Sequence, residues 1–213
     1  MWTPCGEVRP SGDALYEAMA AALRTAPIHA IRAQCQLTPG VPVAPMLAKP
    51  SKSIAEVLKR VGGRRMTAEY KYDGERIQLH RLPDGSMRIF SRNQEDTTQR
   101  WPELAAAEFW TERALAPQDD GMRAATFVLD AEVVAWDPGT KRPQPFQTLS
   151  TRKRKAANAA SNTVRVIVQG FDLLYLNGVS LLRKPLEVRR AALRSTFREV
   201  EGRFEPVAPG RGL

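Results

Sequence analysis

Runs of apolar residues divide the chain into strands, and two of these runs are long. Residues 126–136 and 164–175 are apolar with few interruptions, which is typical of strands buried in a sheet. Shorter runs predict strands at 66–72, 77–82 and 87–90, with the turn residues Pro83-Asp84-Gly85-Ser86 between the last two. We expect the three shorter strands to form an antiparallel meander.

Helical spacing of apolar residues occurs in four other segments. Residues 53–61 start at Ser53, and Glu56 three residues later completes a capping-box pattern. The other expected helices cover 13–25, 103–113 and 186–198. Strands in runs with helices inserted between them predict an α+β fold, built on antiparallel sheets with flanking helices.

Prolines and glycines suggest the domain limits. Several prolines fall between residues 39 and 50, so this stretch is expected to be an extended linker or domain entry. We place a boundary near Leu37, which leaves 1–37 as an N-terminal extension and 38–205 as the main domain. Residues 206–213 show no strand pattern and read as a disordered tail.

Composition narrows the class of protein. The chain has 213 residues, 43% of them hydrophobic, and no run approaches the roughly 20 apolar residues that cross a bilayer, so we expect a soluble intracellular protein. Two cysteines and two histidines support neither a disulfide framework nor a zinc site. From Thr151 onward, 13 basic residues face 5 acidic ones, which accounts for +8 of the net charge of +9. A basic half fits either a surface that meets a phosphate backbone or a solvated face.

One short motif suggests chemistry. Lys71, Asp73, Gly74 and Arg76 form the pattern Lys-x-Asp-Gly-x-Arg where a strand is expected to turn into the next. Gly74 can adopt φ > 0 and lets the backbone approach a ligand, while Arg76 offers a planar fork for a hydroxyl or phosphate oxygen. A lysine attacks only as the neutral amine, and roughly 0.04% of an unperturbed amine is neutral at pH 7. We therefore expect Asp73 to orient a metal-bound water or a loop amide, since beside the lysine it would favour the charged form.

The order of several segments resembles the ATP-dependent DNA ligases, most closely their eukaryotic replicative branch. The matching segments are Pro45-Met46-Leu47-Ala48, the Lys71 motif, Ser91-Arg92-Asn93-Gln94-Glu95-Asp96, Leu129-Asp130-Ala131-Glu132-Val133-Val134-Ala135-Trp136, Gln144-Pro145-Phe146-Gln147, Thr151-Arg152-Lys153-Arg154-Lys155 and Phe171-Asp172-Leu173-Leu174-Tyr175-Leu176-Asn177-Gly178. They cover about Pro42 to Glu205. The resemblance implies an incomplete nucleotidyltransferase (adenylation) domain with an ATP-grasp-like fold.

Residue roles follow from this resemblance. It implies that Lys71 is the adenylated nucleophile, that Glu69 lies beside adenine and that Arg76 contacts ribose and phosphate. It further implies that Arg92 reaches the ribose or the 5′-phosphate, that Glu132 is a ribose or metal-shell carboxylate, and that Phe171 stacks on adenine. The implied cofactors are ATP and Mg²⁺, and the implied partner is nicked double-stranded DNA. A monomer in the nucleus, or alternatively the mitochondrion, acting in replication, repair and recombination, is expected.

Simpler interpretations remain for single residues. Arg92 could be a surface arginine, Glu132 could only pair with an arginine, and Phe171 could be an ordinary core residue. Asp172 is expected to be structural and His80 to be packed or hydrogen-bonded. The run 152–155 fits a nuclear localisation signal, a DNA-facing loop or a solvated loop.

Two other functions compete with DNA ligation. One is a related lysine nucleotidyltransferase, an RNA ligase or an mRNA-capping enzyme that uses GTP. The other is a catalytically silent basic module that binds DNA. The family's later Glu-Gly strand, its Lys-x-Lys strand and its oligonucleotide-binding domain have no match after Phe204. We therefore expect the chain to be a partial ligase, with residues 1–37 as a remnant of a DNA-binding domain.

Overall fold

The computed structural model describes residues 37–64, 66–117, 124–152 and 164–207. Upstream it describes only Glu17, Ala20, Ala21 and Arg24, all of them helical. The rest of the predicted 13–25 helix lies outside the described residues. So do most of the 1–37 extension, residues 208–213 of the predicted tail, and Lys153 to Lys155 of the basic run.

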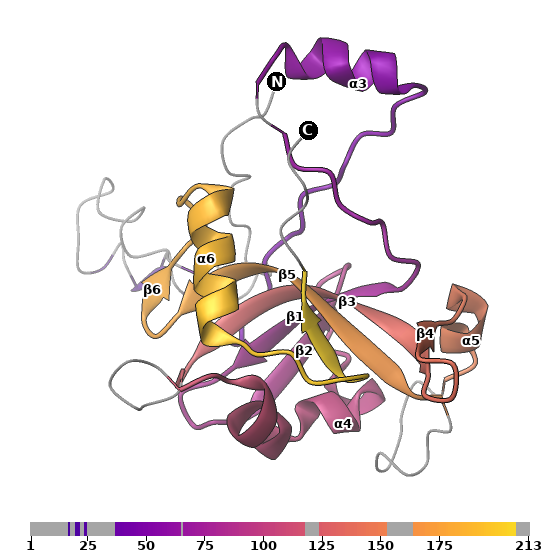
Figure 1. Cartoon of the computed structure of the whole chain (residues 1–213). Coiled ribbons are helices and arrows are strands. Elements are labelled where there is room, and N and C mark those ends of the chain that lie inside the picture. Colours follow the sequence, from indigo (N-terminus) through magenta and orange to yellow (C-terminus); the bar gives the residue numbers. More distant parts are fainter. Residues whose placement is uncertain are drawn as a thin grey trace.

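An antiparallel sheet forms the body of the molecule (Figure 1). Its strands are β1 (Glu75–Arg81), β2 (Met87–Ser91), β3 (Phe127–Asp137), β5 (Val166–Leu176) and β6 (Val179–Ser180), in the order β2-β1-β3-β5-β6. Short β4 (Arg142–Pro143) pairs with β3, and β7 (Phe204–Pro206) pairs with β5 in parallel. The predicted α+β class with antiparallel pairing is confirmed.

The expected meander is confirmed for 77–82 and 87–90, which pair as β1 and β2, and is wrong for 66–72. Residues 66–72 form no strand, and the two edges of β1 pair with β2 and β3 instead. After the β1–β2 hairpin the chain also crosses over, so that β3 pairs with β1 and not with β2. The two long runs became the central strands β3 and β5, and Asn177 and Gly178 turn the chain with φ of 44° and 87°.

Helices flank the sheet, largely where the spacing predicts them. They are α3 (Ile54–Val61), α4 (Pro102–Ala105), α5 (Phe146–Ser150) and α6 (Leu186–Thr196), with a 3-10 turn at Thr98–Arg100. Ser53 caps α3 by accepting from the Glu56 amide, as the capping-box pattern predicts. The helix expected at 103–113 is wrong as one element, because α4 ends at Ala105 and a π-helix follows at Phe109–Ala114.

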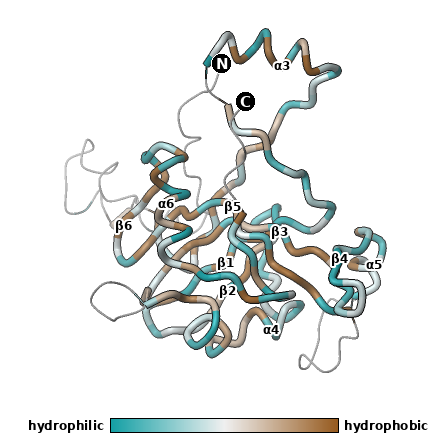
Figure 2. Tube along the Cα trace, in the orientation of Figure 1, coloured by the Kyte–Doolittle hydropathy of each residue, from teal (hydrophilic) through white to brown (hydrophobic). Residues whose placement is uncertain are grey.

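The main core lies on one face of the sheet. Ile77 and Leu79 of β1 point into it, and Trp110 is the centre of its aromatic cluster, with ring contacts to Phe109, Phe127, Phe197 and Phe204. The hydropathy trace shows the apolar residues concentrated along β3 and β5 (Figure 2). Helices α4 and α6 and the π-helix pack against this face. A second, smaller apolar cluster of Leu37, Val43, Val128 and Leu174 lies on the opposite face, beside polar residues.

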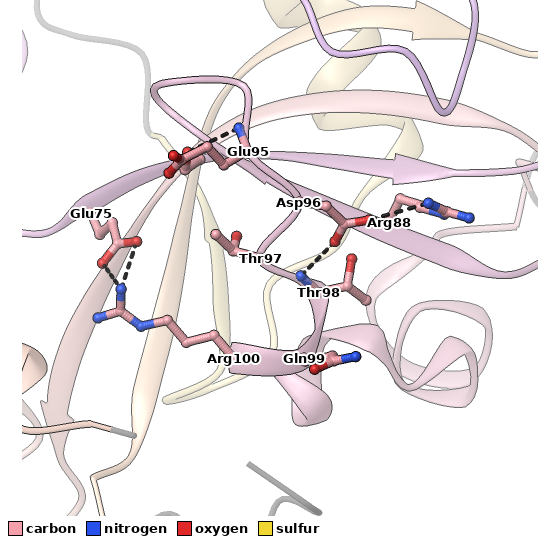
Figure 3. Close-up of a pocket in the computed structure, with 9 residues that line it drawn as sticks. Glu75, Arg88, Glu95, Asp96, Thr97, Thr98, Gln99 and Arg100 are labelled. Carbon is pink, nitrogen blue, oxygen red and sulfur yellow. Dashed lines mark hydrogen bonds and ion pairs between the residues drawn. The ribbon is translucent and has the colours of Figure 1, made fainter. Parts of the chain in front are cut away.

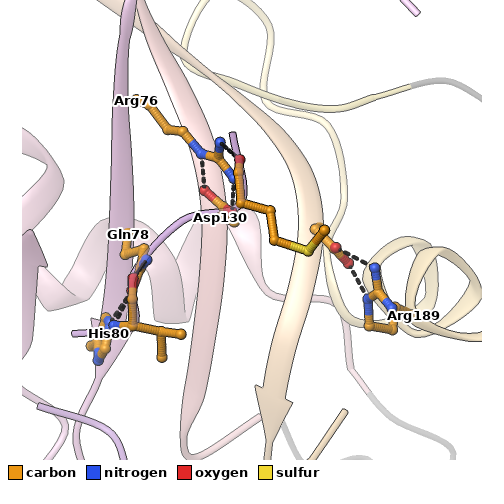
Figure 4. A network of polar contacts seen from close by, with 8 residues as sticks. Arg76, Gln78, His80, Asp130 and Arg189 are labelled. Carbon is orange, nitrogen blue, oxygen red and sulfur yellow. Dashed lines mark hydrogen bonds and ion pairs between the residues drawn. The ribbon is translucent and has the colours of Figure 1, made fainter. Parts of the chain in front are cut away.

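The opposite face carries an alternating polar row on β1, composed of Arg76, Gln78 and His80 (Figure 4). Across this row lies the segment 37–46, which we term the strap. All three side chains bind the main chain of the strap. Gly40 donates its amide to His80 Nδ1 at 3.0 Å, Gln78 binds both the amide and the carbonyl of Val43, and Arg76 donates to the Met46 carbonyl at 3.1 Å. His80 is therefore both packed and hydrogen-bonded, as predicted.

The predicted tail begins too early. Pro206 belongs to β7, and the Val207 amide donates to the Gly170 carbonyl at 2.7 Å. Phe204 is fully buried against Gly170, so the glycine on β5 provides the room that the ring needs. Tertiary pairing with β5 thus orders a stretch whose prolines suggested disorder.

Candidate active site

Lys71 lies on an exposed segment, residues 69–74, which we term the lysine segment. It runs outside the sheet and leads into β1. At its C-terminal end Gly74 packs so closely on β3 that a Cβ there would collide with the Val133 carbonyl oxygen. Asp73 accepts a hydrogen bond from the Phe146 amide of α5 at 3.3 Å. Asp73 therefore contacts the first amide of a helix, which is close to, but not the same as, the loop amide predicted for it.

Arg76 is the hub of the polar face. Its guanidinium forms a bidentate ion pair with Asp130, at 3.0 Å from Nε and 2.6 Å from Nη2, while Nη1 holds the strap at Met46. The same guanidinium lies 5.3 Å from the centroid of the Phe171 ring, a cation–π distance. Most of its donors are thus already engaged, which fixes the side chain in place beside the site.

Glu132 lies on β3 directly opposite Arg76 and is half-buried. Burial raises the pKa of its carboxyl, and the positive charges of Lys71 and Arg76 and the Gly74 amide oppose that rise. Glu132 also lies against the lysine segment, since a Cβ on Gly74 would come within 2.9 Å of its Cγ. A carboxylate so placed can bind a ribose hydroxyl or share a metal ion.

Phe171 occupies a β-bulge between β3 and β5. The register steps from Asp130 opposite Asp172 to Ala131 opposite Gly170, so Phe171 is the extra residue. Its ring is half-buried under Arg76 and lies outside the two buried apolar clusters. The alternative interpretation as an ordinary core phenylalanine is therefore wrong.

Glu69 lies at the N-terminal end of the lysine segment. Its carboxylate pairs with Arg190 of α6 at 2.6 Å, and its side chain is 31% exposed. Near it, burial and the charges of Glu205 and Glu69 raise the pKa of Tyr72. The lysine segment therefore passes close to β7 and α6 as well as to β3.

Arg92 stands apart from the other predicted site residues. It is exposed and directly follows Ser91, whose partner on β1 is Ile77, so it lies at the same sheet end as Arg76. Ser91 Oγ accepts the amides of Asn93 and Glu95 and so fixes this turn. Among the described residues, no hydrogen bond or ion pair joins the Arg92 side chain to Lys71 or Glu132.

A cavity of about 810 Å³ lies beside this turn (Figure 3). Two ion pairs line it, Glu75 with Arg100 at 2.8 Å and Arg88 with Asp96 at 3.2 Å. Burial raises the pKa of Glu75 even though Arg100 opposes the rise. Because its charges are largely paired with one another, the cavity offers no strong field for a single small ion.

The basic run 152–155 is not wholly exposed. Arg152 is buried, pairs with Glu103 at 2.5 Å, donates to the carbonyls of Arg100 and Val164, and stacks 4.8 Å from the ring centroid of Trp101. For Arg152 the DNA-facing and solvated interpretations are therefore wrong. The sequence alone does not reveal that Arg152 is buried, because it stands in a run of basic residues.

Sequence reasoning missed Asp130 and the arginine pair of α6. Asp130 is two residues before Glu132 on one strand, so the alternation of a strand predicts that both face the same side. Arg189 binds Asp172 in a bidentate pair, at 2.8 Å from Nε and 2.7 Å from Nη2, which confirms the structural role expected of Asp172. No local sequence pattern predicts the role of Arg190, because its partner Glu69 is 121 residues away in the chain.

Across the described ranges, no group of three or more His, Cys, Asp or Glu side chains is placed to hold a metal ion by itself. The same ranges contain no helix with the length and apolarity to cross a membrane.

Comparison with known proteins gives the class. The family model of the ATP dependent DNA ligase domain matches residues 45–208, well over half of the chain, and the chain therefore belongs to this family. It is 43% identical over 190 residues to DNA ligase 1 of Drosophila melanogaster, covering 89% of this chain and 24% of that protein. Over 171 residues it is 45% identical to DNA ligase 1 of Saccharomyces cerevisiae, covering 80% and 22%.

The chain thus spans about a quarter of the length of these relatives. Among solved structures, the ligase domain of LigD from M. tuberculosis covers 70% of this chain, with 27% identity and a TM-score of 0.49.

Proposed function

We propose that this chain carries out the adenylation chemistry of an ATP-dependent DNA ligase. The Lys71 amine attacks the α-phosphorus of ATP, a P–N bond forms, and the P–O bond to pyrophosphate breaks. AMP then passes from the lysine to the 5′-phosphate of a DNA nick. Attack by the 3′-hydroxyl seals the strand and releases AMP.

The observation that supports this most directly is the meeting of unlike groups at the lysine segment. Lys71 shares its electrostatic neighbourhood with Glu132. Arg76 and Phe171 lie beside them through a cation–π contact and the Arg76–Glu132 register. Lys71 can attack the α-phosphate, Glu132 can bind a ribose hydroxyl or a metal ion, Arg76 can contact phosphate or ribose oxygens, and the ring of Phe171 can stack on the base.

Each residue then has a proposed role. Phe171 stacks on adenine with the face that Arg76 leaves free, and Glu69 lies beside the base. Arg76 and Arg92 contact ribose and phosphate oxygens, for which planar guanidinium groups are well suited. Mg²⁺ sites of this kind use one or two carboxylates together with substrate phosphates and waters, and Glu132 supplies such a carboxylate. The ion would neutralise charge that develops on the phosphates.

The test is the intact mass of the chain after incubation with ATP and Mg²⁺. The wild-type chain gains one AMP and Lys71→Ala gains none, while Lys59→Ala on the exposed side of α3 serves as the matched lysine control. An adduct on Lys71→Ala would refute the assignment. Labelling by GTP alone would favour a capping-type enzyme, and salt-dependent binding to nicked DNA without any adduct would favour a silent basic module.

The biological setting follows from the named relatives. We propose that the parent activity serves DNA replication, repair and recombination, on nicked duplex DNA, in the nucleus. A monomer is sufficient for the proposed steps, because every group they use comes from one chain. Sedimentation of the purified chain with and without nicked DNA measures both the stoichiometry and the binding.

A further inference from the structure

Among the described residues, polar contacts hold the lysine segment at its two ends, and Tyr72 between them is half-buried. Gly74 and Asp73 attach its C-terminal end to β3 and α5. At its N-terminal end the Glu69–Arg190 ion pair, at 2.6 Å, attaches it to α6. Between these points Tyr70 is 89% exposed and Lys71 is also exposed. The path of the lysine therefore depends on both end contacts.

Arg190 is itself rigidly mounted. It is 7% exposed, and its neighbour Arg189 locks α6 to β5 through the bidentate pair with Asp172. Leu193, one turn further on, is fully buried in the main core. The guanidinium of Arg190 thus extends from a fixed helix toward a segment that has no strand pairing.

Burying the Arg190 guanidinium costs free energy, and its ion pair with Glu69 offsets that cost only in part. The Nε atom is buried without a hydrogen-bond partner among the described residues. A buried cation with an unpaired donor reduces stability unless another gain offsets it. Arg189 and Leu193 also attach α6 to the sheet, through Asp172 and the main core.

We propose that Arg190 is a positioning residue for Lys71. It fixes the carboxylate of Glu69, and through the backbone of the lysine segment it fixes the position from which the amine attacks. The inference rests on the proposed function, because it assigns the ion pair a task in adenylation. Reaction in line with a leaving group needs close alignment, and a misplacement of about 1 Å costs on the order of 10²-fold in rate.

The experiment measures adduct formation by quenched mass spectrometry over a range of ATP concentrations with Mg²⁺. Arg190→Met lowers the rate constant at saturating ATP on the order of 10²-fold, with a smaller change in the half-saturating concentration. Arg190→Lys, which keeps the charge but loses the planar fork, restores part of that loss. In combination with Glu69→Gln, Arg190→Met adds little further loss, because both changes break the same contact.

Arg189→Met is the matched control. It removes a buried arginine from the adjacent position of the same helix and destabilises the fold, yet the folded fraction keeps its rate within about threefold of wild type. Equal rate losses in the Arg189 and Arg190 variants, or full additivity with Glu69→Gln, would overturn the proposal.

Hydrogen exchange of the peptide that spans residues 69–74 tests the positioning role of Arg190 separately from the proposed adenylation function. Arg190→Met speeds exchange there and Arg189→Met leaves it unchanged. A wild-type chain that forms no adduct overturns the proposed function and, with it, the catalytic task of the pair. Unchanged exchange in Arg190→Met overturns the positioning role whatever the adduct experiment shows.

Discussion

Acid should weaken this fold through His80. The imidazole is fully buried, and burial lowers its pKa from 6.5 to about 3. Nδ1 accepts a hydrogen bond from the Gly40 amide at 3.0 Å. A proton on Nδ1 would remove this acceptor and place an N–H of the ring against the N–H of Gly40. A histidine with a lowered folded pKa stabilises the protein above its unfolded pKa near 6.5, and this contribution is lost as the pH falls below it.

The size of the effect follows from the folded and unfolded pKa values of His80. A difference of one between two pKa values corresponds to about 1.36 kcal/mol. Between pH 7 and pH 5 the unfolded chain takes up about 0.7 proton at this position and the folded chain takes up almost none. The free energy of unfolding therefore falls by about 2 kcal/mol over that interval.

Urea unfolding at pH 5, 6 and 7, followed by tryptophan fluorescence, measures this loss. Burial raises the pKa of Glu75, Asp130 and Glu132, and such carboxyls favour the folded state as the pH falls, so a non-titrating variant is needed for comparison. His80→Asn keeps an acceptor near the position of Nδ1. It lowers stability at every pH but removes the loss of about 2 kcal/mol, and parallel pH curves for the two proteins would refute the argument.

Three further predictions concern a glycine, an ion pair and an exposed surface. Gly74→Ala places a Cβ against the Val133 carbonyl oxygen, so unfolding measured in urea becomes easier by about 1–3 kcal/mol and AMP labelling is lost, whereas Gly139→Ala serves as a control that changes neither. Asp172→Ala leaves Arg189 buried without its carboxylate and costs about 3–5 kcal/mol, most of which returns on adding Arg189→Met; no recovery in the double variant would contradict a buried unpaired charge as the cause. Ile54→Glu on α3, where the side chain is 78% exposed, reduces the fluorescence of a bound hydrophobic dye and changes stability by less than about 0.5 kcal/mol, and an unchanged dye signal would place the apolar patch elsewhere.

Sequence patterns identified the strands that bury both faces, the capped helix α3 and the amphipathic helix α6. The long apolar runs that became β3 and β5 could be recognised because little else forms such runs. The break in the predicted 103–113 helix could not be recognised from the sequence, because it depends on which side chains the core buries. Phe109 and Ala114, and likewise Trp110 and Leu115, are five residues apart and all buried, and a π-helix brings such pairs onto one face.

Residues 66–72 illustrate the opposite failure. Their composition favours a strand, yet they pair with no strand of the sheet, and β2 and β3 take the two edges of β1. For the candidate site, the motif located Lys71, Asp73 and Arg76, and the resemblance added Glu132 and Phe171. The Arg76–Asp130 pair needed knowledge of the register, and Glu69–Arg190 needed the three-dimensional path of α6.

The strap has a mechanical consequence. β1 holds it by backbone atoms, at Gly40, Val43 and Met46. The side chains of Leu37 and Val43 add a second attachment, because they are buried in a small apolar cluster with Val128 and Leu174. The last of the backbone contacts is made by Arg76, which also holds Asp130 and covers Phe171. Tension on the chain upstream of residue 37 would therefore load the contacts at His80 and Gln78 before it reached Arg76, so these two residues shield the site from the upstream chain.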